Sequence, residues 1–374
     1  MTIPSELLAP DYSGGSLNNL VAELEWRLTG SAPAPRLRTD VADRIPTAAT
    51  YILFLIDGLG VHQLRHPAAG GLASSHRGTI HAPFPTTTTV SLACVATGLP
   101  PARHGFIGHF LLLNSHPRPV NGLRWIDTAG RPVASYAAGL LPAPNLWERL
   151  GAAGVEAITV QPDAFAGTPL TKSLYRGCRF EGVTGTDELV RATVELARVP
   201  GRLLFVYYHL VDIAAHMQGP SSRAYAHAVA DASNAWERIS ARLPGHVAMV
   251  GTADHGVLSI PEPGKLRLRS RDTPGLTLFG DPRSLYVTGP RERIEELGER
   301  LPAAWHPRET LARLWGAGAD RGARVQPGRV RKPNGAFLAD RGRVLLPGHM
   351  DTRLVGYHGG LEPEEVEIPV LLSG

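Results

Sequence analysis

Short apolar runs recur along the chain, and each of them ends in polar residues or glycine. The clearest runs cover residues 51–56, 155–160, 203–208, 247–250 and 366–372. Runs this short and this rich in branched side chains are typical of strands that are buried on both faces, as in a mostly parallel sheet. The pattern therefore predicts five buried strands of such a sheet.

Helix-like stretches lie between these runs. Residues 145–153 precede the second run, residues 187–198 lead to the third, and residues 221–243 lead to the fourth. An alternation of this kind predicts an α/β layered fold with helices on both faces of the sheet.

The segment from about residue 264 to residue 343 differs from the rest in composition. It contains 17 Lys+Arg against 9 Asp+Glu, a net charge of +8, which leaves −4 for the remainder of the chain. Pro and Gly interrupt it repeatedly, and we expect a smaller subdomain or cap, inserted before the chain returns to the sheet near Val355. Its charge fits either a well-solvated surface or a positive rim that attracts an anionic substrate.

Length and overall composition allow one large domain or two ordinary ones. The chain has 374 residues, 43% of them hydrophobic, and of the two arrangements we expect one domain over residues 1–374 with the basic segment inserted in it. The net charge of +4 does not by itself indicate nucleic-acid binding. The basic segment also lacks the regular aromatic interleaving of a base-stacking platform, so we expect no nucleic-acid partner.

Neither a membrane segment nor a disulfide framework is predicted. No run approaches the ~20 apolar residues that cross a bilayer. The N-terminus has no basic start followed by an apolar stretch, and we expect a cytoplasmic protein. Cys94 and Cys178 belong to no CxxC pair, so we expect two reduced, buried thiols.

Four separated places put metal-ligand residues directly after an apolar run or a glycine turn. Because loops at the carboxyl ends of strands converge on one crevice in open α/β sheets, these residues could meet although they span 300 positions. Together they supply three Asp and three His, the oxygen and nitrogen mixture that suits Zn²⁺. The residues are Asp57, then Asp212 with His216, then Asp254 with His255, and finally His358.

Each of these pieces has a plain structural alternative. An Asp at a strand end can cap a helix, and Asp212 with His216 at i,i+4 spacing can form a helical surface pair. Asp254-His255-Gly256 can be a turn. The conjunction of all four places in this order favours a metal site.

Four consecutive threonines, Thr86 to Thr89, precede a helix-like apolar run at residues 92–97. This order places a hydroxyl at a helix N-terminus, where backbone N–H groups and the helix dipole favour phosphate or an alkoxide. A Thr hydroxyl becomes a good nucleophile only when a base or a metal lowers its pKa. Ordinary N-capping also accounts for one of the four.

The order of these motifs resembles the nucleotide pyrophosphatase/phosphodiesterase family of the alkaline phosphatase superfamily. It runs Asp-Gly, Phe-Pro-Thr, Thr-Gly-Leu, His-Gly, Asp-x-x-x-His-x-x-Gly-Pro, Asp-His-Gly and Gly-x-His-Gly, over about residues 51–374. The resemblance implies an alkaline phosphatase-like three-layer α/β/α fold with a mostly parallel central sheet and an inserted cap. Sulfatases are less similar, because Cys94 does not lie in a Cys-x-Pro-x-Arg setting.

The resemblance also implies roles for individual residues. The family's nucleophile lies ten residues before the Gly of Thr-Gly-Leu, which here assigns Thr88, with Thr87 and Thr89 as runners-up. Two zinc ions per chain are implied. One would be held by Asp212, His216 and His358, and the other by Asp57, Asp254 and His255, with Thr88 bridging toward it.

The implied activity is that of a two-metal hydrolase which cleaves small phosphate esters through a phospho-threonine intermediate. A phosphodiesterase or nucleotide pyrophosphatase is the first interpretation, and a phosphomonoesterase or phosphonate hydrolase of the same superfamily is the second. A non-catalytic metal-binding scaffold would lack a ligand or the nucleophile, and the sequence lacks neither.

His109 departs from the family pattern. Many eukaryotic members carry an Asn at this position, five residues after the His104-Gly105 step begins, and that Asn donates to the phosphate. An imidazole can donate the same hydrogen bond, and in its protonated form it would favour a more anionic substrate. The other reading is a ring that packs beside the site.

Overall fold

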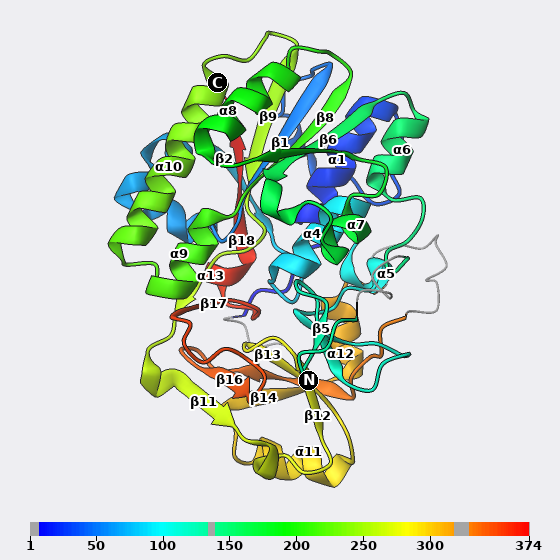
Figure 1. Ribbon diagram of the computed structural model, residues 1–374, viewed down its shortest axis with the longest axis vertical. Coiled ribbons are helices and arrows are strands. Elements are labelled where there is room, and N and C mark those ends of the chain that lie inside the picture. The colour runs from blue at the N-terminus through cyan, green and yellow to red at the C-terminus, as the bar shows by residue number, and fades with distance from the viewer. Residues whose placement is uncertain (1–6, 134–138, 318–328, 374) are drawn as a thin grey trace.

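The computed structural model describes residues 7–133, 139–317 and 329–373. Its centre is a seven-stranded sheet with the strand order β2-β18-β9-β1-β8-β6-β7 (Figure 1). Within this sheet β18 runs antiparallel to β2 and β9, and the other described strand pairs are parallel. The strands are β1 (Thr50–Ile56), β2 (His76–His81), β6 (Glu156–Pro162), β7 (Arg179–Val183), β8 (Arg202–Tyr208), β9 (Val247–Thr252) and β18 (Glu367–Leu372).

All five predicted strands are present in this sheet, each within two residues of the predicted limits. Every residue of β1 is buried, and so are six of the seven residues of β8. Strands covered on both faces can be apolar throughout, which is why their runs are visible in the sequence. The mostly parallel α/β sheet is therefore confirmed.

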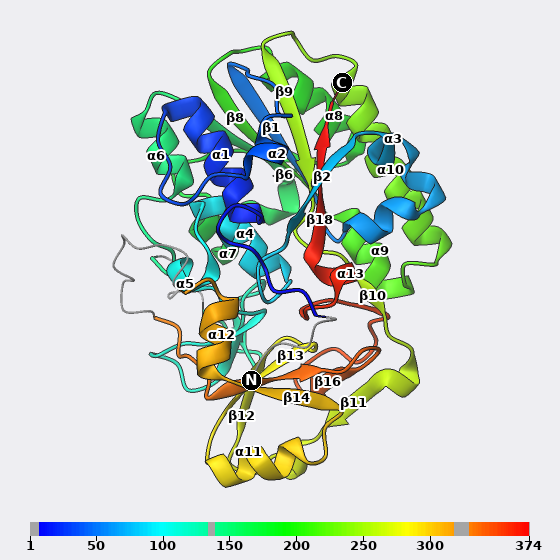
Figure 2. The same cartoon turned by 180° about the vertical axis from the view of Figure 1, so that it is seen from behind.

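Helices cover both faces of the sheet, as predicted. Figures 1 and 2 show α1, α4 and α6 on one side and α8, α9 and α10 on the other. The predicted helices correspond to α6, which begins at a capping box formed by Asn145, and to α8 and α10. The core helices are α1 (Leu17–Thr29), α2 (Thr39–Ala42), α3 (Gly70–Ser74), α4 (Thr88–Thr97), α5 (Pro101–His104), α6 (Leu146–Ala152), α7 (Pro169–Leu174), α8 (Thr186–Leu196), α9 (Leu210–Gln218), α10 (Arg223–Ser240) and α13 (Pro363–Val366).

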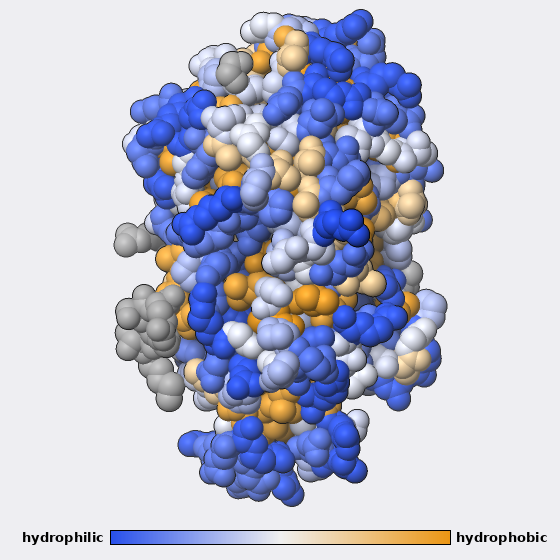
Figure 3. Space-filling model, turned by 90° about the vertical axis from the view of Figure 1, so that its left-hand side faces the viewer, coloured by the Kyte–Doolittle hydropathy of each residue, from blue (hydrophilic) through white to orange (hydrophobic). Residues whose placement is uncertain are grey.

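A second, antiparallel sheet forms the lower part of the molecule in Figure 1, and we call this part the cap. Its strand order is β14-β15-β13-β12-β3-β4-β5. Figure 3 shows one side of the molecule, on which apolar residues gather near the level where the two parts meet. The cap strands and helices are β3 (Phe110–Leu112), β4 (Pro119–Asn121), β5 (Ile126–Asp127), β12 (Thr277–Gly280), β13 (Ser284–Thr288), α11 (Arg291–Gly298), β14 (Ala303–Pro307), α12 (Arg308–Leu314) and β15 (Gly335–Ala339).

The basic segment at about 264–343 supplies four of the seven strands of this sheet, while β3, β4 and β5 come from residues 110–127. Two small pairs lie beside it: β11 (Lys265–Leu268) with β16 (Val344–Pro347), and β10 (Leu258–Ser259) with β17 (Gly356–Tyr357). The cap is thus built from two stretches of chain, and the division of the chain into domains stays a prediction.

A buried ion pair joins the cap to the central part. Arg283, before β13, has a side chain only 1% exposed and lies 3.1 Å from the Glu365 carboxylate in α13. Its guanidinium also donates to the carbonyl oxygens of Asp340 and Arg343, each at 2.8 Å. A buried charge must be paired in this way, so Arg283 fixes how the two parts meet.

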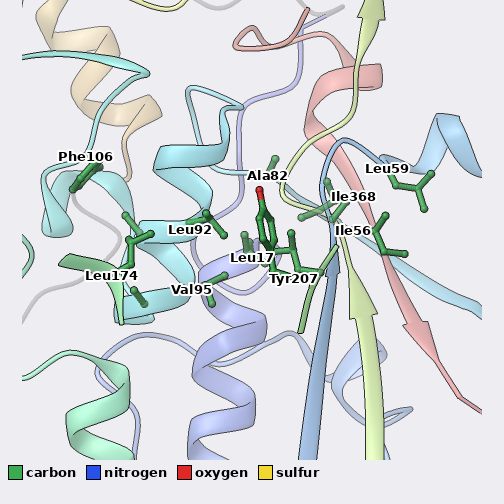
Figure 4. Close-up of a cluster of buried hydrophobic side chains, with 14 of the residues drawn as sticks. Leu17, Ile56, Leu59, Ala82, Leu92, Val95, Phe106, Leu174, Tyr207 and Ile368 are labelled. Carbon is green, nitrogen blue, oxygen red and sulfur yellow. The ribbon is translucent and has the colours of Figure 1, made fainter. Parts of the chain in front are cut away.

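The core beneath the carboxyl ends of the central strands is apolar. Figure 4 shows Leu92 and Val95 of α4 near Leu17 of α1 and Tyr207 of β8. Helix α4 therefore packs against α1. Of the two cysteines, Cys94 is buried in α4 as expected, whereas Cys178 is only partly buried; both are free thiols. Among the described residues, no helix combines the length and apolar character of a membrane span.

Candidate active site

Three neighbouring strands deliver most of the predicted ligands to one edge of the central sheet. β1 pairs in parallel with both β8 and β9, so their carboxyl ends lie side by side. Asp57 follows β1 directly, Asp254 and His255 follow β9, and Asp212 lies in the first turn of α9 after β8. The convergence expected for an open α/β sheet is therefore present.

One group of three side chains consists of Asp212 and His216 on α9 and His358 after β17. One ligand atom from each lies within 4.8 Å of the other two. His216 Nε2 is 3.2 Å from Asp212 Oδ2 and 3.1 Å from His358 Nε2. We call this group the outer triad, because all three residues line the open cavity.

The other group, the inner triad, consists of Asp57, Asp254 and His255, all buried. His255 Nε2 lies 3.2 Å from Asp254 Oδ2 and 3.5 Å from Asp57 Oδ1. Asp254 is oriented by the backbone N–H of Gly58, which donates to its Oδ1 at 3.0 Å. Gly58 has φ = 75°, and a Cβ there would lie 3.0 Å from Asp212, so glycine allows the two triads to approach.

The histidines of both triads are held in the orientation that a metal ligand requires. Nδ1 of His216 lies 2.8 Å from the carbonyl oxygen of Gly356, and Nδ1 of His358 lies 2.7 Å from that of Thr86. Nδ1 of His255 lies 3.1 Å from its own neighbour's carbonyl oxygen. A carbonyl only accepts, so each Nδ1 carries the hydrogen and each Nε2 is left toward the triad.

The carboxylates of the two triads also indicate that the site binds cations. Asp57 Oδ1, Asp212 Oδ1 and Asp254 Oδ2 are buried and have no hydrogen-bond partner. A buried carboxylate oxygen without a partner is costly, and a bound cation removes that cost. The two triads therefore fit two metal ions, and their mixed oxygen and nitrogen donors suit zinc.

The close packing of ionisable groups shifts pKa values within the cluster. Burial, together with Asp254 and Asp212, raises the pKa of Asp57 well above its usual range. Burial and the neighbouring His255 lower the pKa of His358 well below its usual value, whereas, against the effect of burial, the adjacent Asp212 carboxylate raises the pKa of His216 to about 9. The rings of His255 and His358 stack with centroids 3.6 Å apart, so the triads are in direct contact.

Of the four consecutive threonines, Thr88 is the one whose hydroxyl reaches a triad. Its Oγ1 lies 3.3 Å from His255 Nε2, in the first turn of α4. The other hydroxyls are engaged elsewhere: Thr86 donates to Gly360, Thr87 bonds Asp281, and Thr89 donates to the carbonyl oxygen of Gly108. This contact is consistent with Thr88 as the nucleophile, the residue that the motif spacing indicated, and the assignment stays a prediction.

His109 lies at the cavity wall, half-buried, directly before β3. Asn121 Oδ1 accepts from the backbone N–H groups of Leu123 and Arg124, so its Nδ2 faces His109 Nε2 at 3.0 Å and donates to it. Nδ1–H is then the remaining donor of this ring. Burial lowers the pKa of His109 to about 4, so the structure favours the neutral imidazole over the protonated form considered from the sequence.

Three residues that the sequence did not single out complete the site. Tyr207 donates its hydroxyl to Asp57 Oδ2, and Asn121 holds the ring of His109. Asp281, between β12 and β13, accepts from the backbone N–H of His109 at 3.2 Å, and burial raises its pKa to about 7. No local motif marks the contacts of Tyr207 and Asp281, because they span 150 and 172 positions.

The cavity in front of Thr88 has a volume of about 480 Å³. The outer triad, Thr88 and His109 line it, whereas the residues of the inner triad are not part of its lining. Its exposed walls are largely apolar, with Leu123 among the exposed side chains. A small phosphate ester can therefore reach the hydroxyl and the outer triad together.

Comparisons with known proteins agree with this geometry. The family model described as type I phosphodiesterase / nucleotide pyrophosphatase matches residues 51–271, more than half of the chain. No curated protein sequence matches. Murine ectonucleotide pyrophosphatase / phosphodiesterase 5 has a similar structure at 18% identity and a TM-score of 0.64, covering 87% of this chain and 88% of its own.

Two further solved structures contain ligands. An inactive form of the same murine protein in complex with AMP is 16% identical, covers 87% of this chain and 88% of its own, and has a TM-score of 0.63. Phosphonoacetate hydrolase from Sinorhizobium meliloti 1021 in complex with phosphonoacetate is 17% identical, covers 88% of this chain and 91% of its own, and has a TM-score of 0.61. At these identities the similarity shows a shared fold.

Proposed function

The chain belongs to the type I phosphodiesterase / nucleotide pyrophosphatase family. On this basis we propose that it is a zinc-dependent hydrolase of phosphate esters, with phosphodiesters as its preferred substrates. The observation that carries the proposal is the position of Thr88. Its hydroxyl lies 3.3 Å from His255 of the inner triad and faces a cavity that the outer triad also lines.

The residues present fit two cations, of which the inner triad would hold one and the outer triad the other. Bound zinc ions supply Lewis acidity, which neutralises phosphoryl charge and lowers the pKa of a hydroxyl. The N-terminus of α4 presents Thr88 where backbone N–H groups and the helix dipole stabilise negative charge.

The reaction has two steps at phosphorus. Thr88 Oγ1 gives up its proton to solvent and forms a bond to phosphorus, while the bond from phosphorus to one ester oxygen breaks and the alcohol leaves with a proton from water. A water molecule then bonds to the phosphorus, the Oγ1–P bond breaks, Oγ1 regains a proton from that water, and a phosphate monoester leaves. In this proposal Nδ1–H of His109 donates to a non-bridging phosphoryl oxygen, since Asn121 occupies its Nε2.

The neutral form of His109 favours a monoanionic diester over a dianionic monoester. The complexes of the two structural relatives contain a phosphate monoester, AMP, and a phosphonate, phosphonoacetate. Monoesters and phosphonates are therefore the runner-up substrates.

The test is hydrolysis by metal-depleted protein before and after addition of zinc. We expect bis(p-nitrophenyl) phosphate to be cleaved only after reconstitution, with a kcat/KM above that for p-nitrophenyl phosphate. A reversed preference would move the assignment to a phosphomonoesterase. Absence of turnover with every ester in a nucleotide, diester, monoester and phosphonate panel would contradict the proposed function.

A further inference from the structure

Exposed large apolar side chains concentrate at the mouth of the candidate active site. Among the described residues, six large hydrophobic side chains are exposed, and three of them line this one cavity: Leu123 at 39%, Ile213 at 48% and Met217 at 55%. We call these three residues the apolar rim. Single exposed apolar residues are ordinary, but a group at one cavity indicates a binding surface.

We infer that the apolar rim binds an apolar ester substituent, so that the preferred substrate is an alkyl or aryl phosphodiester with no second charged group close to the phosphorus. This inference rests on the proposed function and extends it to the substrate class.

Helix α9 combines the ligands and the rim in one element. Asp212 and His216 lie at i,i+4 spacing, and Ile213 and Met217 repeat that spacing one position later. Residues four apart lie on the same face of a helix, so two adjacent stripes run along α9, one of metal-ligand side chains and one of apolar side chains. A phosphoryl group held by the first stripe places its substituent against the second.

Another part of the cavity lining comes from a turn that is held by hydrogen bonds. Asn121 Oδ1 accepts from the backbone N–H groups of Leu123 and Arg124 at 3.0 and 2.9 Å. Trp125 adopts φ = 54°, a conformation uncommon outside glycine, and its side chain is 1% exposed. The buried indole anchors the turn, and the turn leaves Leu123 exposed at the cavity rather than packed in the core.

The charges around the cavity fit the same substrate class. Arg124 and Arg353 are the lysine or arginine side chains among its described lining residues, and both are exposed. Arg353 is already paired with Asp351 at 2.7 Å. Within this described lining, no buried lysine or arginine is available to bind a second phosphate or a carboxylate. Exposed apolar surface, in contrast, is available to bind an alkyl or aryl group.

Binding of n-alkylphosphonates to the zinc-loaded full chain tests this inference by calorimetry. Methyl-, propyl- and hexylphosphonate carry the same head group, so only the apolar substituent changes. Burial of a methylene on the rim should lower Kd about two- to fourfold per added CH₂. The variants Leu123→Gln and Met217→Gln should each reduce this gain, and their metal content should match that of the wild type.

Val199→Gln is the matched control, because Val199 is 48% exposed and lies before β8, away from the cavity. It should retain the full gain per methylene. A Kd that does not depend on chain length, or a gain that survives in both rim variants, would overturn the inference while leaving the metal site intact. Failure of methylphosphonate itself to bind would instead contradict the proposed function, and the inference with it.

Discussion

Replacing each of three neighbouring threonines in turn shows which of their hydroxyls is needed for turnover. Thr88→Ala removes the hydroxyl that lies 3.3 Å from His255 Nε2, whereas Thr87→Val and Thr89→Val each remove a hydroxyl that bonds elsewhere in the protein. We expect Thr88→Ala to abolish turnover, while fold and metal content stay close to those of the wild type.

The expected losses of kcat differ by orders of magnitude between Thr88→Ala and the two valine variants. Loss of a covalent nucleophile costs on the order of 10⁴- to 10⁶-fold in kcat. Loss of the hydrogen bond from Thr89 to Gly108, or of the one between Thr87 and Asp281, costs about 1 kcal/mol of stability. If all of that cost appeared in the activation barrier, kcat would fall roughly fivefold. Thr88→Ser keeps a hydroxyl at the same place and should retain measurable activity.

The assay is steady-state hydrolysis of bis(p-nitrophenyl) phosphate by zinc-loaded protein, with circular dichroism and elemental analysis on every variant. Intact-mass analysis of quenched reactions should detect a wild-type chain that carries one p-nitrophenyl phosphoryl group, and no such adduct in Thr88→Ala. An active Thr88→Ala with an inactive Thr87→Val would refute the reasoning, because it would place the nucleophile one residue earlier.

Three further substitutions test the surroundings of the site. Tyr207→Phe removes the hydroxyl that orients Asp57 and should weaken metal binding about 10- to 100-fold in a zinc titration, so an unchanged affinity would speak against that contact. His109→Ala should lower kcat by ~10²–10³-fold with metal content unchanged, and His109→Asn should recover part of the loss, whereas wild-type kinetics would remove this ring from the site. Arg283→Met leaves buried carboxylates uncompensated and should lower the free energy of unfolding by about 3–5 kcal/mol in urea, while the exposed Arg291→Met should shift the midpoint little; equal shifts would contradict the role given to the buried pair.

The central sheet could be predicted because its strands are covered on both sides. Such strands are apolar at every position, and β1 and β8 stand out in the sequence for that reason. The strands β3, β4 and β5 could not be predicted in the same way. They have two or three residues each, too few to show a period, and β3 joins them to the rest of the cap sheet by pairing with β12.

Some residues of the candidate site could likewise be predicted from the sequence, and others could not. Its ligands follow strands or helices with recognisable spacing, as Asp212 and His216 do on α9, so the sequence indicated them together. Asp281 could not be found this way, because its contact with His109 spans 172 positions and depends on how the cap meets the central part. The register at Thr88 came from the resemblance to a family, since four equal threonines carry no internal distinction.

Metal content is the measurement that tests the central claim most directly. Elemental analysis of zinc-equilibrated, dialysed protein should find two metal ions per chain, and Asp254→Ala and His358→Ala should each lower that number, because each removes a donor from a different triad. Chelation should abolish diester hydrolysis, and zinc should restore it. A wild-type chain that binds no metal and still hydrolyses the diester at full rate would contradict the account.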